Sequence, residues 1–306
     1  MHPTLRLVNR FEELLTRQDP QLPYEFSTLF PNDGFWARRA SQKKLSLLKR
    51  IDEPLRSMLH PDERVIFFTQ TVAHSFLESF FLGMPMYYLN RRVLALTTER
   101  IILIQIDSRR RPRELRAQVP LRAVDRFRRT AFGNTSMRLT SGDQYVFVHT
   151  PKRDRKKLVA LVAEARAKAP PSGSDHLEQL CPHCYRVVGG HPAQCPICKG
   201  AFKSWRKAGF LSLLFPGLGD IYLGHARFAV LEILIAGMFW LSILLAIVAP
   251  DPSAPASGAE IGSTALVGFL FLHGVDCAAT FHIAKKGHYP AMPGPVGTPH
   301  PTSTGA

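Results

Sequence analysis

VLALTTERIILIQI, residues 93–106, contains two apolar runs that the polar pair Thr98-Glu99 separates. Each run is rich in β-branched residues and too short for an ordinary helix, so the pattern predicts two strands joined by a tight turn. The first run extends back to Pro85, and further β-rich runs span 65–73, 136–140 and 145–150. We therefore expect a small antiparallel β domain.

Helices are predicted on both sides of this β region. Residues 155–168 place Leu158, Val162 and Ala165 on one helical face, and two earlier stretches show the same spacing. Short antiparallel strands followed by one helix are typical of a small capped barrel or sandwich. The assignment is helices at 3–18 and 36–59 within an N-terminal region of residues 1–60, and a β domain over 61–168.

The hairpin resembles the central hairpin of bacterial pleckstrin-homology-like (GRAM-like) domains, in which a Leu-Thr-x-x-Arg-hydrophobic turn follows a buried strand. Here the turn is Leu96-Thr97-x-x-Arg100. PLRAVDRF at 120–127 and the closing helix follow in the order of that family, and the resemblance covers about residues 55–168. It implies a pleckstrin-homology-like fold that contacts lipid headgroups or a protein partner.

Four cysteines form the pattern C-x2-C-x10-C-x2-C: Cys181, Cys184, Cys195 and Cys198. Each Cys-x-x-Cys turn brings two thiolates together, and two such turns supply the tetrahedral sulfur set that Zn²⁺ accepts. Two disulfides or a redox pair are the alternatives. Residues 1–20 contain no apolar signal run, so we expect reduced cytosolic thiols and therefore zinc. Four thiolates fill the coordination sphere, which predicts a structural metal.

The cysteine module resembles the short zinc ribbons found beside membrane segments in many bacterial proteins, with the pattern CP-x-C…CP-x-CG. Lys199 stands where that glycine is usual, and Gly200 follows it. We assign a linker to 169–180 and the ribbon to 181–203. A ribbon this short cannot bury a core of its own, so the bound metal supplies the free energy of folding. We expect it to couple the β domain to the membrane or to dock a protein.

The C-terminal third is apolar and is predicted to form a helical hairpin in a membrane. Residues 228–249 and 262–284 reach the length of about 20 apolar residues that a spanning helix needs. Residues 208–223 are interrupted by Pro216 and two glycines, so we expect them to be re-entrant or interfacial. The transmembrane region is thus 208–284, and an uncharged tail rich in proline and glycine, 287–306, is expected to be disordered.

The distribution of Lys and Arg predicts the topology. Of 39 basic residues, 36 precede Ala208, and the loop 250–261 between the predicted spans has none. By the positive-inside rule, this loop lies outside and both termini lie in the cytoplasm. We therefore expect a multi-pass, multidomain α+β protein of a bacterial inner (plasma) membrane.

Gly219-Asp220-Ile221-Tyr222-Leu223-Gly224-His225 resembles the polar turn of the two-helix transmembrane domain family, whose pattern is GxG-x-x-x-FYLG. That family has an aspartate in its last helix, as Asp276 is here. The pair before Tyr-Leu-Gly is Asp-Ile rather than Arg-Phe-like, and the spacing from Gly to Tyr is shorter. The resemblance covers about residues 205–284, and these departures leave the family's turn contacts without support.

Charged residues inside predicted spans are costly and usually face a partner. The polar membrane candidates are Asp220, Glu232, His273 and Asp276. His273 and Asp276 are three residues apart and share a helical face. Two interpretations stay open: a polar clamp between helices, which we favour, and part of an ion or proton path.

A net charge of +15 favours an anionic partner. The basic residues cluster in or beside expected loops of the β domain, where each contributes about 1 kcal/mol near an anionic leaflet. A solvated surface that follows the positive-inside bias and contact with lipid are equal alternatives for these residues. The candidates for lipid contact are Arg109, Arg110, Arg111, Arg113, Lys152, Arg153, Lys156 and Lys157. A nucleic-acid partner is disfavoured because the sequence contains no RNP-like aromatic pattern or recognition helix.

Together these features predict a membrane-tethered binding or scaffold module whose β domain contacts anionic headgroups or an unknown protein. One rival is a component of a transport or channel assembly that uses Glu232, His273 and Asp276, which would require a homo-oligomer. A second rival is a zinc-ribbon nucleic-acid binder at the membrane. We recognise no catalytic motif or open metal site, so we do not expect an enzyme.

Overall fold

The computed structural model describes residues 23–30, 37–74, 78, 84–171, 173–249 and 257–292. The helix predicted at 3–18 lies outside them. The chain divides into two compact units, one formed by residues up to Gly189 and one by Gly190–Met292. Each unit is described by itself below.

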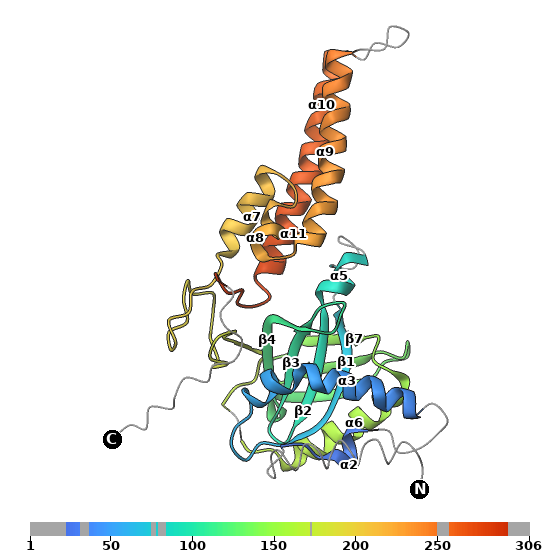
Figure 1. Cartoon of the computed structure of the whole chain (residues 1–306), viewed down its shortest axis with the longest axis vertical. Coiled ribbons are helices and arrows are strands. Elements are labelled where there is room, and N and C mark those ends of the chain that lie inside the picture. The colour runs from blue at the N-terminus through green and yellow to red at the C-terminus, as the bar shows by residue number, and fades with distance from the viewer. Residues whose placement is uncertain are drawn as a thin grey trace. The chain divides into compact units, whose positions relative to one another are not determined.

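The first unit contains one eight-stranded antiparallel sheet (Figure 1), which confirms the predicted α+β character of this region. Its strand order is β5-β6-β7-β1-β2-β3-β4-β8, so the ladder is open and not closed into a barrel. The outer edge of β4 pairs with β8, where Arg116 lies opposite Leu180. The strands are β1 (Val65–His74), β2 (Arg91–Thr97), β3 (Arg100–Ile106), β4 (Pro112–Pro120), β5 (Val124–Arg129), β6 (Thr135–Leu139), β7 (Gln144–Val148) and β8 (Glu178–Leu180).

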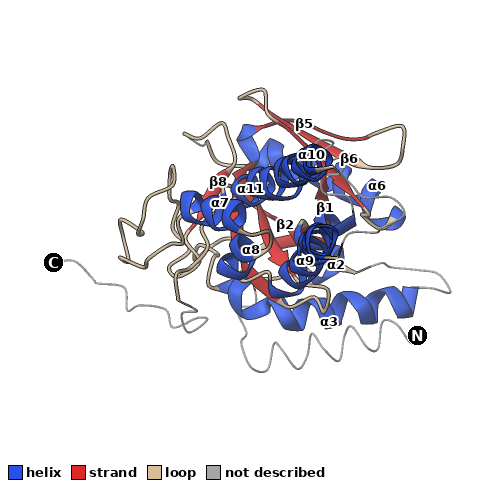
Figure 2. Cartoon of the chain, turned by 90° about the horizontal axis from the view of Figure 1, so that it is seen from above, coloured by secondary structure: helices blue, strands red, loops and turns tan. Residues whose placement is uncertain are grey.

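Helices cover both faces of this sheet (Figures 1 and 2). The helical elements are α2 (Phe26–Leu29), α3 (Ala37–Arg56), α5 (Met84–Leu89), the 3-10 turn η1 (Leu121–Ala123) and α6 (Lys152–Lys168). Along β3, Ile101 and Leu103 belong to the core under α6, whereas Ile102 and Ile104 belong to the core under α3. Burial on both faces explains why β2 and β3 are continuously apolar instead of alternating.

Two expectations for this unit differ from the structure. The run from Pro85 is predicted to be extended, but Met84–Leu89 forms helix α5, and β2 begins only at Arg91. Pro85 falls in the first turn of α5, where a helix does not need its backbone N–H. Within the predicted linker, Glu178–Leu180 forms β8, because the open edge of β4 supplies hydrogen-bonding partners.

The second unit is helical after the end of the cysteine module. Its helices are α7 (Trp205–Leu214), α8 (Leu218–Leu223), α9 (Ala226–Val248), α10 (Gly258–Gly268) and α11 (Val275–Ala284), with the π-helix η2 (Phe269–Gly274) between the last two. The elements α10, η2 and α11 form one continuous helix of 27 residues.

Two of these helices are long and apolar enough to cross a membrane. An 18-residue window of helix α9 has a mean hydropathy of 2.4, and such a window of the continuous helix Gly258–Ala284 has 1.5. Helix α9 buries Ala229 and Ala236 and exposes large apolar side chains along most of its length. The exposed ones are Val230, Leu231, Leu234, Ile235, Met238, Leu241, Leu244, Leu245, Ile247 and Val248.

Residues 208–223, predicted as a re-entrant or interfacial segment, lie in two short helices. Helix α7 ends at Leu214, and α8 begins at Leu218, after Gly217 has adopted a φ of 89° that favours glycine. With 10 and 6 residues, α7 and α8 are about 15 Å and 9 Å long. Neither reaches across a hydrocarbon core of about 30 Å.

The tail predicted to be disordered from residue 287 is ordered in its first part. Phe202 and Pro290 form an isolated bridge, and the Lys203 N–H donates to the carbonyl oxygen of Tyr289 at 2.8 Å. The His288 ring stacks on Phe202 with centroids 4.6 Å apart. These backbone and ring contacts fix the segment despite its composition; residues from Pro293 onward lie outside the described residues.

Candidate functional site

Four cysteine sulfurs come together, as their spacing predicts. The Sγ atoms of Cys181, Cys184, Cys195 and Cys198 all lie within 4.8 Å of one another, and none of them forms a disulfide. A tetrahedron with Zn–S bonds of about 2.3 Å places its sulfurs about 3.8 Å apart. The cluster therefore fits a four-coordinate, thiolate-bound metal ion.

The two halves of the cluster share one backbone geometry. The carbonyl oxygen of Cys181 accepts from the Tyr185 N–H at 3.0 Å, and that of Cys195 accepts from the Lys199 N–H at 3.0 Å. Tyr185 and Lys199 both adopt the left-handed conformation, with φ of 59° and 61°. An L side chain there costs roughly 1–2 kcal/mol, which is why glycine is usual in the ribbon pattern. Lys199 thus departs from the pattern in residue type but not in backbone shape.

The predicted lipid-contacting residues fall in two places. Arg109, Arg110 and Arg111 form the turn between β3 and β4, with Arg113 at the start of β4; Lys152, Arg153, Lys156 and Lys157 lie in the first two turns of α6. Arg113 pairs with Glu114 at 3.4 Å, and Lys157 donates to the carbonyl oxygen of Phe30 at 3.3 Å. Arg113 and Lys157 are therefore already engaged by protein partners.

Three of these residues, Arg110, Lys152 and Arg153, line one pocket of about 530 Å³. Helix α3 supplies further basic side chains, which are not among the predicted lipid-contacting residues. The charged lining consists of Arg39, Lys43, Lys44, Arg110, Lys152, Arg153 and Asp154. Six cations against one carboxylate make this pocket strongly positive, and we call it the basic pocket.

Lys44 and Asp154, which both line the basic pocket, form an ion pair. The Lys44 ammonium lies 3.2 Å from Asp154 Oδ1, donates to the carbonyl oxygen of Leu29 at 3.0 Å, and sits 3.8 Å from the Phe67 ring centroid. Asp154 Oδ2 accepts from the Thr69 hydroxyl at 2.7 Å. Burial lowers the pKa of Lys44 to about 8, although Asp154 opposes that shift.

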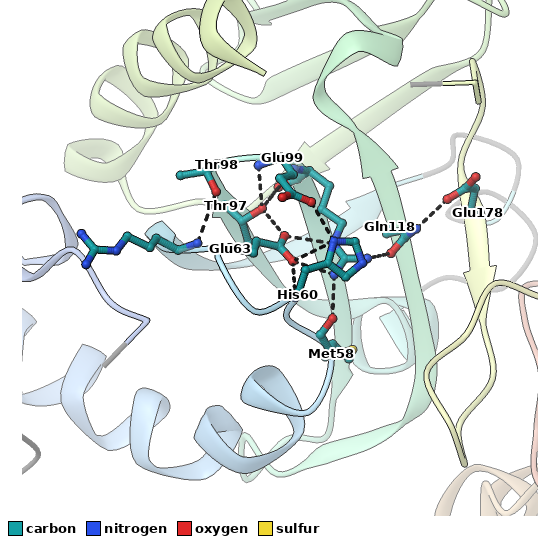
Figure 3. Close-up of polar contacts among 10 residues, drawn as sticks. Met58, His60, Glu63, Thr97, Thr98, Glu99, Gln118 and Glu178 are labelled. Carbon is teal, nitrogen blue, oxygen red and sulfur yellow. Dashed lines mark hydrogen bonds and ion pairs between the residues drawn. The ribbon is translucent and has the colours of Figure 1, made fainter. Parts of the chain in front are cut away.

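The Thr and Arg of the Leu-Thr-x-x-Arg turn belong to a buried network of hydrogen bonds (Figure 3). Glu63 accepts from Arg100 Nε at 2.9 Å and Nη2 at 2.6 Å, and from the Thr97 hydroxyl at 2.5 Å. Arg100 also donates to Gln118, which in turn donates to Glu178 at 2.6 Å. The Thr and Arg of the motif therefore join four strands and the segment before β1, which is a structural role.

His60, Glu63 and Glu99 lie close enough together to suggest a metal site. Glu63 is fully buried, and Arg100 and Thr97 already occupy both of its oxygens. His60 Nδ1 pairs with Glu99 at 2.7 Å at the surface. With its central carboxylate neutralised by Arg100, this group supports no metal assignment.

Three of the four polar membrane candidates come together in the second unit. One carboxylate oxygen from each of Asp220, Glu232 and Asp276 lies within 4.8 Å of the other two. His225, which the sequence analysis did not single out, places Nδ1 2.9 Å from Asp220 Oδ1. His225 is the last residue of the polar-turn motif Gly219–His225, but that motif assigned it no role.

His273 has different neighbours and acts as a clamp. Its Nε2 accepts from the Trp240 indole N–H at 2.9 Å, so the ring proton resides on Nδ1, which donates to the carbonyl oxygen of Leu213 at 2.9 Å. The imidazole therefore joins α7, α9 and η2 in one neutral tautomer. Both ring nitrogens are therefore engaged in hydrogen bonds to other helices.

No protein-family model and no curated protein matches this chain. Among solved structures, the chain is similar to the crystal structure of the linker-DH/PH domains of p115-RhoGEF, with 15% identity over 44% of this chain and 43% of that chain, at a TM-score of 0.31. An N-terminally truncated form of those domains gives 14% identity and a TM-score of 0.29, over 44% of each chain. The chain thus spans less than half the length of these structures, and likeness at this level assigns neither family nor function.

Proposed function

We propose that this chain is a membrane-tethered binding module. In this proposal, its C-terminal helices lie in a bilayer, a structural zinc ribbon connects them to the β domain, and the β domain binds an anionic, phosphate-bearing lipid headgroup. The observation that carries the proposal is the basic pocket, where six cations from α3, the β3–β4 turn and α6 surround about 530 Å³.

The exposed surface of α9 supports the membrane part. Ten large apolar side chains of this helix are exposed, and in water a patch of that size would drive aggregation. Lys285 and Lys286 follow α11, while residues 250–261 contain no Lys or Arg. The positive-inside rule then favours cytoplasmic termini in a bacterial inner membrane.

The geometry of the cysteine cluster supports structural zinc. Four thiolates leave no coordination position for water or substrate. The first half follows directly from β8, and Leu180 forms a bridge with Val187. The second half leads through Ser204, whose side chain caps α7 by accepting from the Lys207 N–H at 3.3 Å. The ribbon is thus the covalent connection between sheet and helices, and a metal there would stiffen it.

A headgroup phosphate suits the basic pocket for two reasons. Arg39, Lys43, Arg110, Lys152 and Arg153 provide the charge, while Lys44 is already paired with Asp154. Helix α6 also begins at the pocket, and its N-cap, Pro151, offers no capping side-chain hydrogen bond. Helix N-termini attract anions because their first N–H groups point outward. A pleckstrin-homology-like domain with this pocket would be anchored by both its helices and its ligand.

The test uses the full chain in mild detergent and short-chain lipids. Dihexanoyl phosphatidylglycerol should bind, whereas dihexanoyl phosphatidylcholine should not, as measured by isothermal titration. Lys43→Glu combined with Lys152→Glu should weaken anionic lipid binding at least tenfold. Lys49→Glu combined with Lys168→Glu is the matched control, because it changes the same charge on exposed positions of the same two helices outside the pocket.

Two results would contradict the pocket assignment. Equal weakening by both double variants would mean that only the net charge matters. Unchanged binding in the pocket variant would place the lipid elsewhere. Glycerol phosphate added alone separates recognition of the phosphate from recognition of the acyl chains, because it carries the headgroup without them. If no anionic lipid binds the wild-type chain, the headgroup proposal fails.

A further inference from the structure

Three carboxylates, two buried and one half-buried, converge in the helical unit from three separate helices. Asp220 lies on α8, Glu232 on α9 and Asp276 on α11, and one oxygen of each lies within 4.8 Å of the others. Asp220 is 0% exposed and Asp276 is 7% exposed. Like charges at this distance repel strongly away from water, so the arrangement needs a positive partner or bound protons.

Protein donors satisfy only part of this cluster. Asp220 accepts from the Thr280 hydroxyl at 3.2 Å and pairs with His225, and Asp276 Oδ2 accepts from the Gly217 N–H at 3.0 Å. Asp276 Oδ1 and Glu232 Oε2 are buried without a hydrogen-bond partner. Within the described residues, the one ion pair that these three carboxylates form is that between Asp220 and His225. Two unsatisfied acceptors in an anionic cluster call for a positively charged ligand or for bound protons.

Glycines let the helices approach closely enough to form the cluster. A Cβ at Gly219 would lie 2.3 Å from the Ala208 carbonyl oxygen and 2.4 Å from Ser212 Oγ, and one at Gly217 would lie 2.6 Å from the Ala229 carbonyl oxygen. Gly217 also has a positive φ of 89°, which directs its N–H to Asp276. The glycine-rich segment before Asp220 therefore builds the site as well as breaking the helix.

We propose that Asp220, Glu232 and Asp276 bind a hard divalent cation. All the donors are oxygens, which suit Mg²⁺, Mn²⁺ and Ca²⁺ rather than zinc or copper. Metal–oxygen bonds of about 2.1–2.5 Å place ligand oxygens roughly 3–5 Å apart, in agreement with the observed spacing. A divalent ion neutralises two of the three charges and gives Asp276 Oδ1 and Glu232 Oε2 a partner. The inference does not depend on the ligand of the basic pocket.

Mn²⁺ is the probe, because it is paramagnetic and disfavours thiolates, which keeps it away from the four-cysteine cluster. The zinc-loaded full chain in detergent is titrated with MnCl₂, and free Mn²⁺ is measured by electron paramagnetic resonance. We expect one Mn²⁺ bound per chain, with competition by Mg²⁺ or Ca²⁺. Asp276→Asn and Glu232→Gln should each weaken Mn²⁺ binding at least tenfold.

Glu260→Gln is the matched control. It removes a carboxylate from the same unit at an exposed position, and glutamine preserves the capping box that Glu260 forms with Ser257. Unchanged Mn²⁺ affinity in this variant and weakened affinity in the cluster variants support the proposal. Zinc content and size-exclusion profiles establish that the variants are folded.

The wild-type chain alone also decides the question. If Mn²⁺ stays free at one equivalent and at tenfold excess, the carboxylates hold protons instead of a metal and the proposal is overturned. Binding that survives both Asp276→Asn and Glu232→Gln would overturn it equally. Neither result bears on lipid binding by the basic pocket, so the two proposals fail separately.

Discussion

Two regions of this molecule bury carboxylates, and they treat them in opposite ways. In the sheet, Glu63 is fully buried, and every oxygen meets a donor from Arg100, Thr97 or the backbone of His60. In the helical unit, Asp276 Oδ1 and Glu232 Oε2 are buried oxygens that have no hydrogen-bond partner. A buried charge whose hydrogen bonds are all made helps to specify the fold, whereas a cluster of carboxylates with unpaired oxygens points to a ligand.

The four-cysteine cluster belongs in this comparison, because it too brings like charges together. Loss of its metal should have the largest effect on stability of the changes that we predict. Removing zinc with a chelator should unfold the ribbon, since structural zinc contributes on the order of 10 kcal/mol to folding. Cys198→Ser should lose the metal, and Cys277→Ser, which changes a cysteine outside the cluster, should retain one zinc per chain. Elemental analysis and limited proteolysis within 181–203 measure both. A ribbon that resists protease equally with and without zinc would contradict this.

Arg100→Met tests the satisfied region. Removing the guanidinium leaves the Glu63 carboxylate buried without its ion pair, so the free energy of unfolding of the sheet should fall by about 3–5 kcal/mol. Adding Glu63→Met should restore part of that loss, which makes the two changes non-additive. Denaturant unfolding in detergent measures the free energy of unfolding of the wild-type chain, the Arg100→Met variant and the double variant. Lys168→Met, at an exposed pair with Glu164, is the control that should leave stability unchanged.

Lys44 carries a buried charge, and its ion pair with Asp154 offsets only part of the free-energy cost of that burial. Its pKa is lowered to about 8 from the ordinary 10.5, mainly by loss of solvation. Between pH 8 and 10.5 the unfolded chain keeps the proton that the folded chain has released, so folded-state stability should rise with pH in that window. We expect a rise of about 2 kcal/mol relative to Lys44→Met. Parallel pH profiles for the two proteins would show that Lys44 does not titrate in this range.

Asp276→Asn should give the smallest effect and the opposite sign from Arg100→Met. Without divalent cations, the change removes one of three like charges, and the asparagine oxygen can still accept from the Gly217 N–H. Stability should stay the same or increase by about 1 kcal/mol. Thermal unfolding in a divalent-free buffer provides the measurement. A clear loss of stability would show that the carboxylate is a structural partner, like Glu63.

The elements that the sequence predicted well depend on local patterns. Residues 93–106 form the β2–β3 hairpin because continuous apolar runs suit strands buried on both faces, and residues 36–59 contain α3. The spacing of the cysteines predicted their convergence. Each Cys-x-x-Cys turn is closed by hydrogen bonds within six consecutive residues, 181–186 and 195–200, so it depends on local sequence. The prediction that the apolar run from Pro85 is extended was wrong as far as Leu89, because short apolar segments fit helix and strand alike.

The sites depend on contacts that no local pattern contains. The basic pocket joins Lys43 to Lys152, which lie on helices separated by most of the sheet in sequence. His273 and Asp276 are three residues apart, but His273 lies in the π-helix η2, so regular helical spacing does not describe their directions. The structure accordingly directs His273 to Trp240 and Asp276 to Gly217.

We propose that the second unit resides in a bilayer and tethers the first. The most direct measurement is alkaline carbonate extraction of membranes from cells that express the full chain. We predict that the protein stays in the membrane pellet and is released only by detergent. Quantitative release into the carbonate supernatant as a folded, zinc-containing monomer would contradict the account.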